Sequence, residues 1–195
     1  MPRRSPALVL SAATALAVAV LLAGCTTPDP APTTAPPTPG DTGSPTPEPS
    51  ETPAAPTPTP VDIPCDSLVT AQAMYDFNPN FSLIDSWTPA AGSPAADAVD
   101  AEGVACRWQN DTSGEVIDVS VASFDPATLE TLANDAYTNS TMVPTYGVDE
   151  AYFAVTGSVG EAIVFDGPYW IVVSSSYFLE PGDAEPIVAS VLAGL

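Results

Sequence analysis

The clearest pattern in this chain is the alternation of apolar and polar residues in its second half. Residues 104–110 and 115–124 alternate with a period of two, and the residues between them are typical of a turn, so the two segments predict a β-hairpin. Three further apolar runs, separated by glycine-containing turns, predict three more strands at 151–156, 161–166 and 169–175. The connections between strands are short, so we expect antiparallel pairing.

Segments with helical periodicity are predicted before, between and after these strands. A first helix is expected to open at Cys65-Asp66-Ser67, with Asp66 or Ser67 as N-cap. Its apolar stripe comprises Leu68, Ala71, Met74 and Tyr75, and Asn78-Pro79-Asn80 ends it. Asp125-Pro126 predicts a second helix that runs to about residue 137, because an acidic cap followed by proline is a typical helix start.

A last helix is expected at about 183–192, and residues 88–100 and 138–150 are expected to be loops, because proline, glycine and small polar residues interrupt them. The order α-β-β-α-β-β-β-α predicts an α+β fold, with a mostly antiparallel sheet of about five strands flanked by helices. Residues 62–195 have the normal size of a single domain.

The amino end has the composition of an export signal. Arg3 and Arg4 precede an apolar run at 7–22, which is shorter than the roughly 20 residues that a spanning helix needs. Leu22, Ala23 and Gly24 then precede Cys25. This arrangement resembles the lipobox of bacterial lipoproteins, which implies cleavage of residues 1–24, lipidation of Cys25 and attachment to the outer face of the cytoplasmic membrane.

Residues 25–61 predict a disordered tether. Residues 26–60 contain thirteen prolines and ten threonines with almost no large apolar side chain, so nothing there offsets the entropy of ordering. The proline density favours an extended polyproline II spacer that reaches up to about 110 Å. O-linked sugars on the Thr-Pro pairs are a sharper hypothesis for the same segment.

Charge narrows the choice of partners. After residue 24 the chain carries 24 acidic side chains and one base, Arg107, for a formal charge of −23. Nucleic acid is therefore excluded as a partner, and anionic headgroups would also repel the domain. The candidate partners are a cell-envelope protein, a wall component or a small apolar ligand, together with the membrane through the acyl anchor.

Two cysteines remain once Cys25 is acylated. An even number of cysteines in an exported domain predicts a disulfide between Cys65 and Cys106, joining the first helix to the first predicted strand. Zinc binding is the competing interpretation, but two thiols without histidine make a poor zinc site.

The early Cys65, followed by Cys106-Arg107-Trp108 on a strand, resembles a family of actinobacterial lipoproteins whose domain has no assigned function. It is also distantly similar to the extracellular sensor domain of mycobacterial serine/threonine kinases. The resemblance covers residues 65–195 and implies an antiparallel sheet flanked by helices in a PsbP-like arrangement. This chain departs from those relatives in its acidity and in lacking a second disulfide.

Composition also limits the chemistry. The chain contains no histidine, which removes Ser-His-Asp and Cys-His catalysis, and no lysine, which removes Schiff-base and P-loop chemistry. Asp97, Asp100 and Glu102 before Gly103 resemble part of a calcium loop, but the first and last ligand positions hold Ala98 and Gln109, so no metal site is assigned. No cofactor is expected.

Three side chains remain as candidate contacts for a ligand or partner: Arg107, Tyr169 and Trp170. Arg107 points away from Cys106 and Trp108 on its strand, where a salt bridge to an acid is favoured over anion binding. Tyr169 and Trp170 are adjacent and therefore point to opposite faces of the sheet, so either helices cover both faces or one aromatic lines a pocket.

These observations predict a membrane-anchored extracytoplasmic lipoprotein with a non-catalytic binding or sensor-like domain. One alternative is a carrier of lipid or another hydrophobic small molecule, which requires a sizeable apolar cavity beside the sheet. The other is a carboxylate-only hydrolase of wall glycans, which requires a cleft with two acids in different environments.

Overall fold

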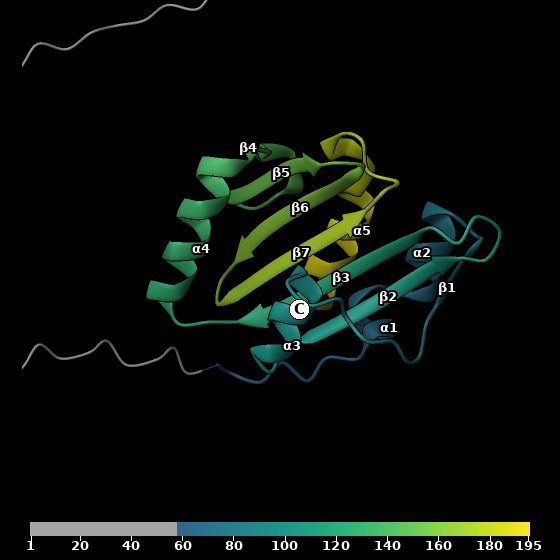
Figure 1. Cartoon of the computed structure of the whole chain (residues 1–195), viewed down its shortest axis with the longest axis horizontal. Coiled ribbons are helices and arrows are strands. Elements are labelled where there is room, and N and C mark those ends of the chain that lie inside the picture. The colour runs from purple at the N-terminus through teal and green to yellow at the C-terminus, as the bar shows by residue number, and fades with distance from the viewer. Residues whose placement is uncertain (1–57) are drawn as a thin grey trace, which may run out of the picture. The chain divides into compact units, whose positions relative to one another are not determined.

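The centre of the fold is a seven-stranded antiparallel sheet in the order β1-β2-β3-β7-β6-β5-β4, seen in a computed structural model that describes residues 58–195 (Figure 1). The strands are β1 (Phe81–Leu83), β2 (Val104–Asn110), β3 (Val116–Ser123), β4 (Thr141–Met142), β5 (Glu150–Thr156), β6 (Val159–Asp166) and β7 (Tyr169–Ser175). The helices are α1 (Cys65–Leu68), α2 (Ala71–Phe77), α3 (Pro94–Asp100), α4 (Pro126–Asn139), the 3-10 turn η1 (Pro144–Tyr146) and α5 (Pro181–Gly194). The α+β class is confirmed.

Two antiparallel units meet in the middle of the sheet. The hairpin β2–β3 and the meander β5–β6–β7 form as the sequence predicts, and β3 joins the meander by pairing with β7. Helix α4 makes the crossover between the two units, so β7 becomes a central strand although it is the last in the sequence.

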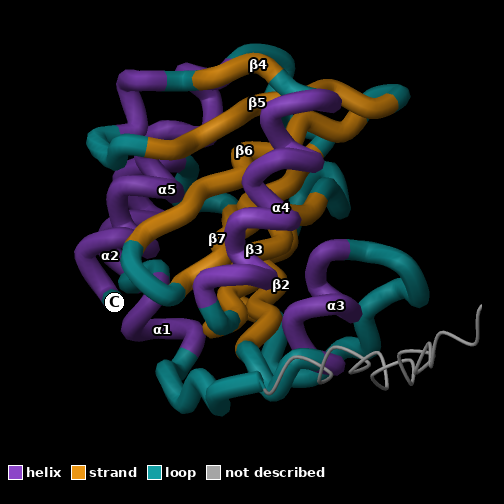
Figure 2. Tube along the Cα trace, turned by 90° about the vertical axis from the view of Figure 1, so that its left-hand side faces the viewer, coloured by secondary structure: helices purple, strands orange, loops and turns teal. Residues whose placement is uncertain are grey.

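Helices cover both faces of the sheet (Figure 2). One face packs against α1, α2 and α5 and holds the larger core, in which Leu68, Met74, Phe178, Ile187 and Val191 are each at most 1% exposed. The other face lies under α3 and α4, where the core is smaller and centres on Ala98, Ala122, Trp170 and Val172. Alternate residues of every central strand therefore face two apolar layers, and Val119 and Ser120 of β3 are both at most 1% exposed.

The first helix differs from the prediction. It is two short helices, and the chain between them is extended at Val69 and Thr70. The side chain of Thr70, rather than Asp66 or Ser67, provides the N-cap hydrogen bond by accepting from the Ala73 amide at 3.1 Å. The continuous apolar stripe concealed this break, because threonine is common in helices as well as at their caps.

The predicted loop at 88–100 is wrong in its second half, where α3 forms. Ser93 caps this helix by accepting from the Ala96 amide at 3.2 Å, and Pro94 occupies the first helical position. The same arrangement of cap and proline correctly placed the start of α4. The alanines and glycine around Ser93 led to the prediction of a loop, but Ala95 and Ala98 are buried against the sheet.

The predicted count of about five strands is also wrong, because short strands were missed at both edges. Strand β1 has three residues and β4 has two, too few for an alternating pattern to be visible in the sequence. The predicted exposed loop at 138–150 contains β4 and η1, and it buries Val143 and Tyr146. Such short strands at the edges reduce the backbone that is open to pairing with other chains.

The first described residues lie against the domain. The Thr59 amide donates to the Ser123 carbonyl at 3.4 Å, and the Val61 amide donates to the Glu102 carbonyl at 3.0 Å. Residues 58–61, which the sequence places at the end of the disordered tether, are instead in contact with the end of β3 and with the turn between α3 and β2. The predicted signal segment and most of the predicted tether lie outside the described residues.

Candidate functional site

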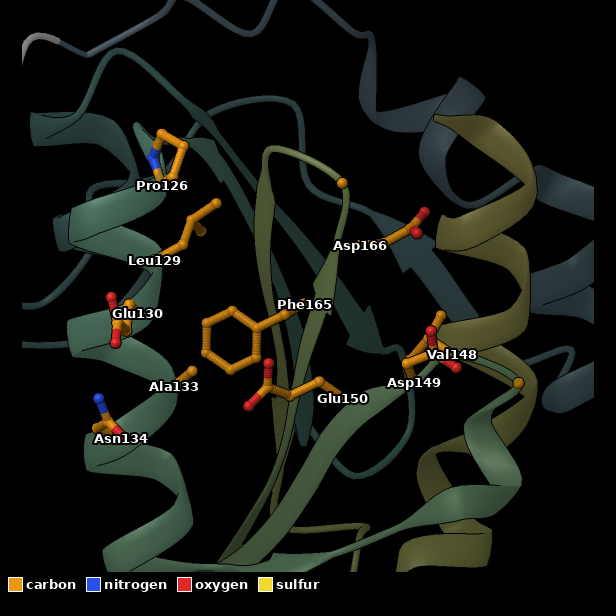
Figure 3. Close-up of a pocket in the computed structure, with 12 residues that line it drawn as sticks. Pro126, Leu129, Glu130, Ala133, Asn134, Val148, Asp149, Glu150, Phe165 and Asp166 are labelled. Atoms are coloured by element: carbon orange, nitrogen blue, oxygen red, sulfur yellow. The ribbon is translucent and has the colours of Figure 1, made fainter.

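A groove of about 660 Å³ lies between α4 and the ends of strands β5 and β6 (Figure 3). Helix α4 provides one wall with Leu129, Glu130, Ala133 and Asn134, and the sheet provides the floor with Phe165 of β6 and Glu150 of β5. The loop from Gly147 to Asp149, the end of β6 at Asp166 with the following Gly167, and Pro126 at the start of α4 complete the lining. The groove is therefore built from three separate parts of the chain.

The helix wall is fixed at its amino end by Asp125. Its carboxylate accepts from the amides of Ala127 and Thr128 at 3.0 and 3.1 Å and from the Thr128 hydroxyl at 2.7 Å. The hydrogen bond from the Thr128 hydroxyl is the main reason that the pKa of Asp125 is lowered. This cap sets the position from which Leu129 and Glu130 reach the groove.

The floor is fixed by a buried tyrosine. Glu150 and Phe165 are cross-strand partners, and Tyr152, two residues along β5, is 2% exposed and forms a T-shaped pair with the Phe165 ring, with 6.4 Å between centroids. The Tyr152 hydroxyl donates to Glu150 Oε1 at 2.9 Å. Burial, and then this hydrogen bond to Glu150, raise the pKa of Tyr152 to about 12, so the hydroxyl keeps its proton at any physiological pH.

The groove combines acids with an apolar centre. Its four ionisable lining residues are all acidic: Glu130, Asp149, Glu150 and Asp166. The Phe165 ring lies in the middle, with the Glu150 carboxylate beside it and Leu129 above it on the helix wall (Figure 3). Such a lining is complementary to a cation with an apolar stem, because carboxylates hold the charge and the ring contacts the methylenes.

The predicted disulfide is present on the opposite face of the sheet. Cys65 and Cys106 are bonded, with Cα atoms 5.5 Å apart and a sequence separation of 41 residues. The bond joins α1 to β2 inside the larger core, where Cys106 is 1% exposed. It is a structural crosslink and does not line the groove.

Arg107 forms the ion pair that the sequence favours over anion binding. Its guanidinium donates two hydrogen bonds of 2.7 Å to Asp118, the residue directly across from it on β3. It also stacks over the Trp87 ring at 3.8 Å from the centroid. The hydrogen bonds from Arg107 to Asp118 raise the pKa of the arginine, so its charge is permanent and already paired.

The two candidate aromatics lie on opposite faces, and helices cover both. Tyr169 packs beside the larger core, and Trp170 is 8% exposed and packs beside Phe124, with 6.2 Å between ring centroids. Neither residue lines the groove. The groove residues were not identified from the sequence, because Glu130 and Glu150 look like any other of the 24 acids until α4 is placed over β5 and β6.

Leu22, Ala23, Gly24 and Cys25 lie outside the described residues. Among residues 58–195, none of the helices combines the length and the hydrophobicity of a membrane-spanning segment. In the same part of the chain, no group of three or more histidine, cysteine, aspartate or glutamate side chains is placed to hold a metal ion. Asp97 and Asp100 lie on α3, and Glu102 follows it with a positive φ of 55°, so the segment that resembles a calcium loop is a helix end.

The chain matches no protein-family model, no curated protein and no solved structure.

Proposed function

We propose that this chain is a lipid-anchored extracytoplasmic lipoprotein whose folded domain binds a cell-envelope protein without catalysing a reaction. The groove between α4 and β5–β6 takes a basic segment of that partner, with arginine or lysine heads on the carboxylates and their stems on Phe165. The single observation that carries this proposal is the Glu150 carboxylate held by Tyr152 beside the apolar centre of the groove.

The charge of the domain supports a basic partner. Four carboxylates surround the groove, and Arg107, the one base among the described residues, is paired with Asp118. A basic segment would therefore meet attraction both at long range and at the site. The volume of about 660 Å³ accommodates two or three side chains rather than a folded domain.

The anchor and tether complete the proposal. Lipidation of Cys25 holds the amino end at the membrane, and the tether before residue 58 carries the domain outward. The family resemblance and the PsbP-like arrangement stay predictions, and they agree with a sensor-like or binding role. A lipid carrier is less well supported, because acidic side chains surround the groove where a carrier needs an apolar lining.

A carboxylate-only glycan hydrolase is the second candidate, on one specific observation. Burial raises the pKa of Glu161, a half-buried residue of β6, and a carboxyl group with a raised pKa is what a general acid requires. Release of sugars from purified wall glycan by the mature chain, lost in Glu161→Gln, would replace the binding proposal with this one.

The groove is tested by peptide binding in 0.15 M salt. We expect a six-residue peptide of alternating arginine and leucine to bind the mature chain, and the double variant Glu130→Gln/Glu150→Gln to weaken binding about tenfold through the loss of two ion pairs. The control Asp85→Asn/Glu185→Gln removes the same charge from exposed positions that do not line the groove. Equal weakening by both double variants would show attraction by net charge alone and would refute the groove.

The anchor is tested separately. We expect the wild-type chain to fractionate with membranes and Cys25→Ala to be released or left unprocessed. Membrane association of Cys25→Ala equal to that of the wild type would refute the anchor while leaving the groove result intact.

A further inference from the structure

A second cavity, of about 290 Å³, lies on the other flank of α4, between this helix, α3 and strands β5, β6 and β7. Leu132, Asp135, Ala136 and Asn139 line it from α4, whereas Leu129, Glu130, Ala133 and Asn134 line the groove. The helical spacing of the two sets places them on different sides of the helix. The cavity is therefore separate from the groove to which the proposed function is assigned.

We propose that this cavity is a binding site for a small primary amine with an apolar body, whose ammonium group contacts Glu161. The proposal goes beyond the function assigned to the groove and does not depend on it.

The sheet side of the cavity has an apolar patch. Ile163, Trp170 and Val172 come from neighbouring strands on one face of the sheet, and Trp170 and Val172 belong to the smaller core. A volume of about 290 Å³ is near the lower end of the roughly 300–1,000 Å³ of small-molecule pockets. The size suits an amine with a short alkyl chain or a single ring, and the indole provides a surface for both its body and its charge.

The acidic groups come from three elements. Glu161 of β6 is half-buried, whereas Asp97 of α3 and Asp135 of α4 are exposed at the rim. Strands β5 and β7 contribute no ionisable side chain to the lining. No lysine or histidine occurs in the chain, and Arg107 is engaged by Asp118, so no base within residues 58–195 is free to neutralise these acids.

Glu161 has no hydrogen-bonding partner among the described side chains and backbone groups, unlike Glu150, which is held by Tyr152. A half-buried carboxylate without a partner is costly, and burial accordingly raises the pKa of Glu161. An ammonium ion in the cavity would donate hydrogen bonds to this carboxylate and supply an opposite charge, which favours the ionised carboxylate. Amine binding should therefore weaken as the pH falls through the raised pKa of Glu161.

The test uses titration calorimetry of the mature chain with phenethylamine and with cadaverine in 0.15 M salt at pH 7.5. Phenethyl alcohol serves as the neutral match for phenethylamine. We expect at least one amine to bind with a Kd below 1 mM, the alcohol to bind at least about tenfold more weakly, and Glu161→Gln to weaken amine binding at least about tenfold. Glu185→Gln, at an exposed position of α5 that lines neither the cavity nor the groove, is the matched control and should change the Kd less than about twofold.

Folding of the variant is verified independently. Glu161→Gln removes a half-buried charge, so at pH 7.5 its melting temperature should equal or exceed that of the wild type. Absence of binding by both amines at 5 mM would overturn the proposal, as would equal binding of phenethylamine and its alcohol. Equal weakening by Glu161→Gln and Glu185→Gln would also overturn it, because net charge would then explain the attraction. These outcomes are independent of peptide binding in the groove.

Discussion

Breaking the bond between Cys65 and Cys106 should cost the domain a large part of its stability. The bond closes a loop with a sequence separation of 41 residues, which contains α1, α2, β1 and α3. In the unfolded chain, the crosslink removes most of the separations that its two ends would otherwise sample. Its loss therefore stabilises the unfolded state much more than it changes the folded one.

The magnitude follows from the length of the loop. The chain-entropy relation with 41 residues gives about 13 cal/mol/K, or about 4 kcal/mol at 25 °C. The unfolding entropy of a domain of this size is about 0.3 kcal/mol/K near its melting temperature, at roughly 2.1 cal/mol/K per residue. Reduction should therefore lower the melting temperature by about 14 °C.

The assay is thermal unfolding followed by circular dichroism, with and without a phosphine reductant, on a chain that carries Cys25→Ser so that Cys65 and Cys106 are the only thiols. Reduction keeps both sulfur atoms in place, so it isolates the crosslink. The double variant Cys65→Ala/Cys106→Ala should add a smaller loss, because Cys106 is 1% exposed and its sulfur fills core space. A reduced protein that melts within about 3 °C of the oxidised one would refute the loop-entropy argument.

Three further predictions concern single side chains. Arg107→Gln should lower the free energy of unfolding in urea by about 1–2 kcal/mol, because it leaves the partly buried Asp118 without its partner. An unchanged urea midpoint would show that the ion pair contributes nothing to stability. Gly160→Ala should lower the free energy of unfolding by about 2–3 kcal/mol, because a Cβ there meets the packed atoms of Phe178. Gly182→Ala, in open space on α5, should leave the free energy of unfolding unchanged or raise it slightly. Similar urea midpoints for the two variants would contradict the packing. Asp125→Ala should lower the free energy of unfolding at pH 7, because the folded state lowers the pKa of Asp125 and therefore favours its ionised form. The difference from the wild type should shrink as the pH falls below about 4, where the carboxyl group becomes protonated. A difference independent of pH would refute the cap.

The sequence predicts the centre of this fold better than its edges. Strands β2, β3, β5, β6 and β7 are confirmed. Strands β2 and β3 are long enough for a period of two to be visible, and β5, β6 and β7 stand out as apolar runs between glycine-containing turns. The disulfide is confirmed for a different reason: with Cys25 set aside, only one pairing remained. The start of α4 is confirmed because Asp125-Pro126 is a local signal that depends on no tertiary contact.

The elements that were missed depend on contacts distant in sequence. The alanines of α3 form a helix where they can pack against β2 and β3, and the two residues of β4 form a strand only through pairing with β5. The groove also depends on contacts between residues that are distant in sequence. Glu130 and Glu150 are 20 positions apart, and only the packing of α4 over the meander brings both into one lining.

The position of Cys65 has a mechanical consequence. Cys65 lies four residues after Val61, whose amide donates a hydrogen bond to the Glu102 carbonyl. Tension applied to the chain before residue 58 must therefore first break the backbone hydrogen bonds of Thr59 and Val61. The force is then transmitted through the disulfide from Cys65 to Cys106 on β2. The segment between the two cysteines is bypassed and cannot be drawn out, which limits how far the domain extends under load.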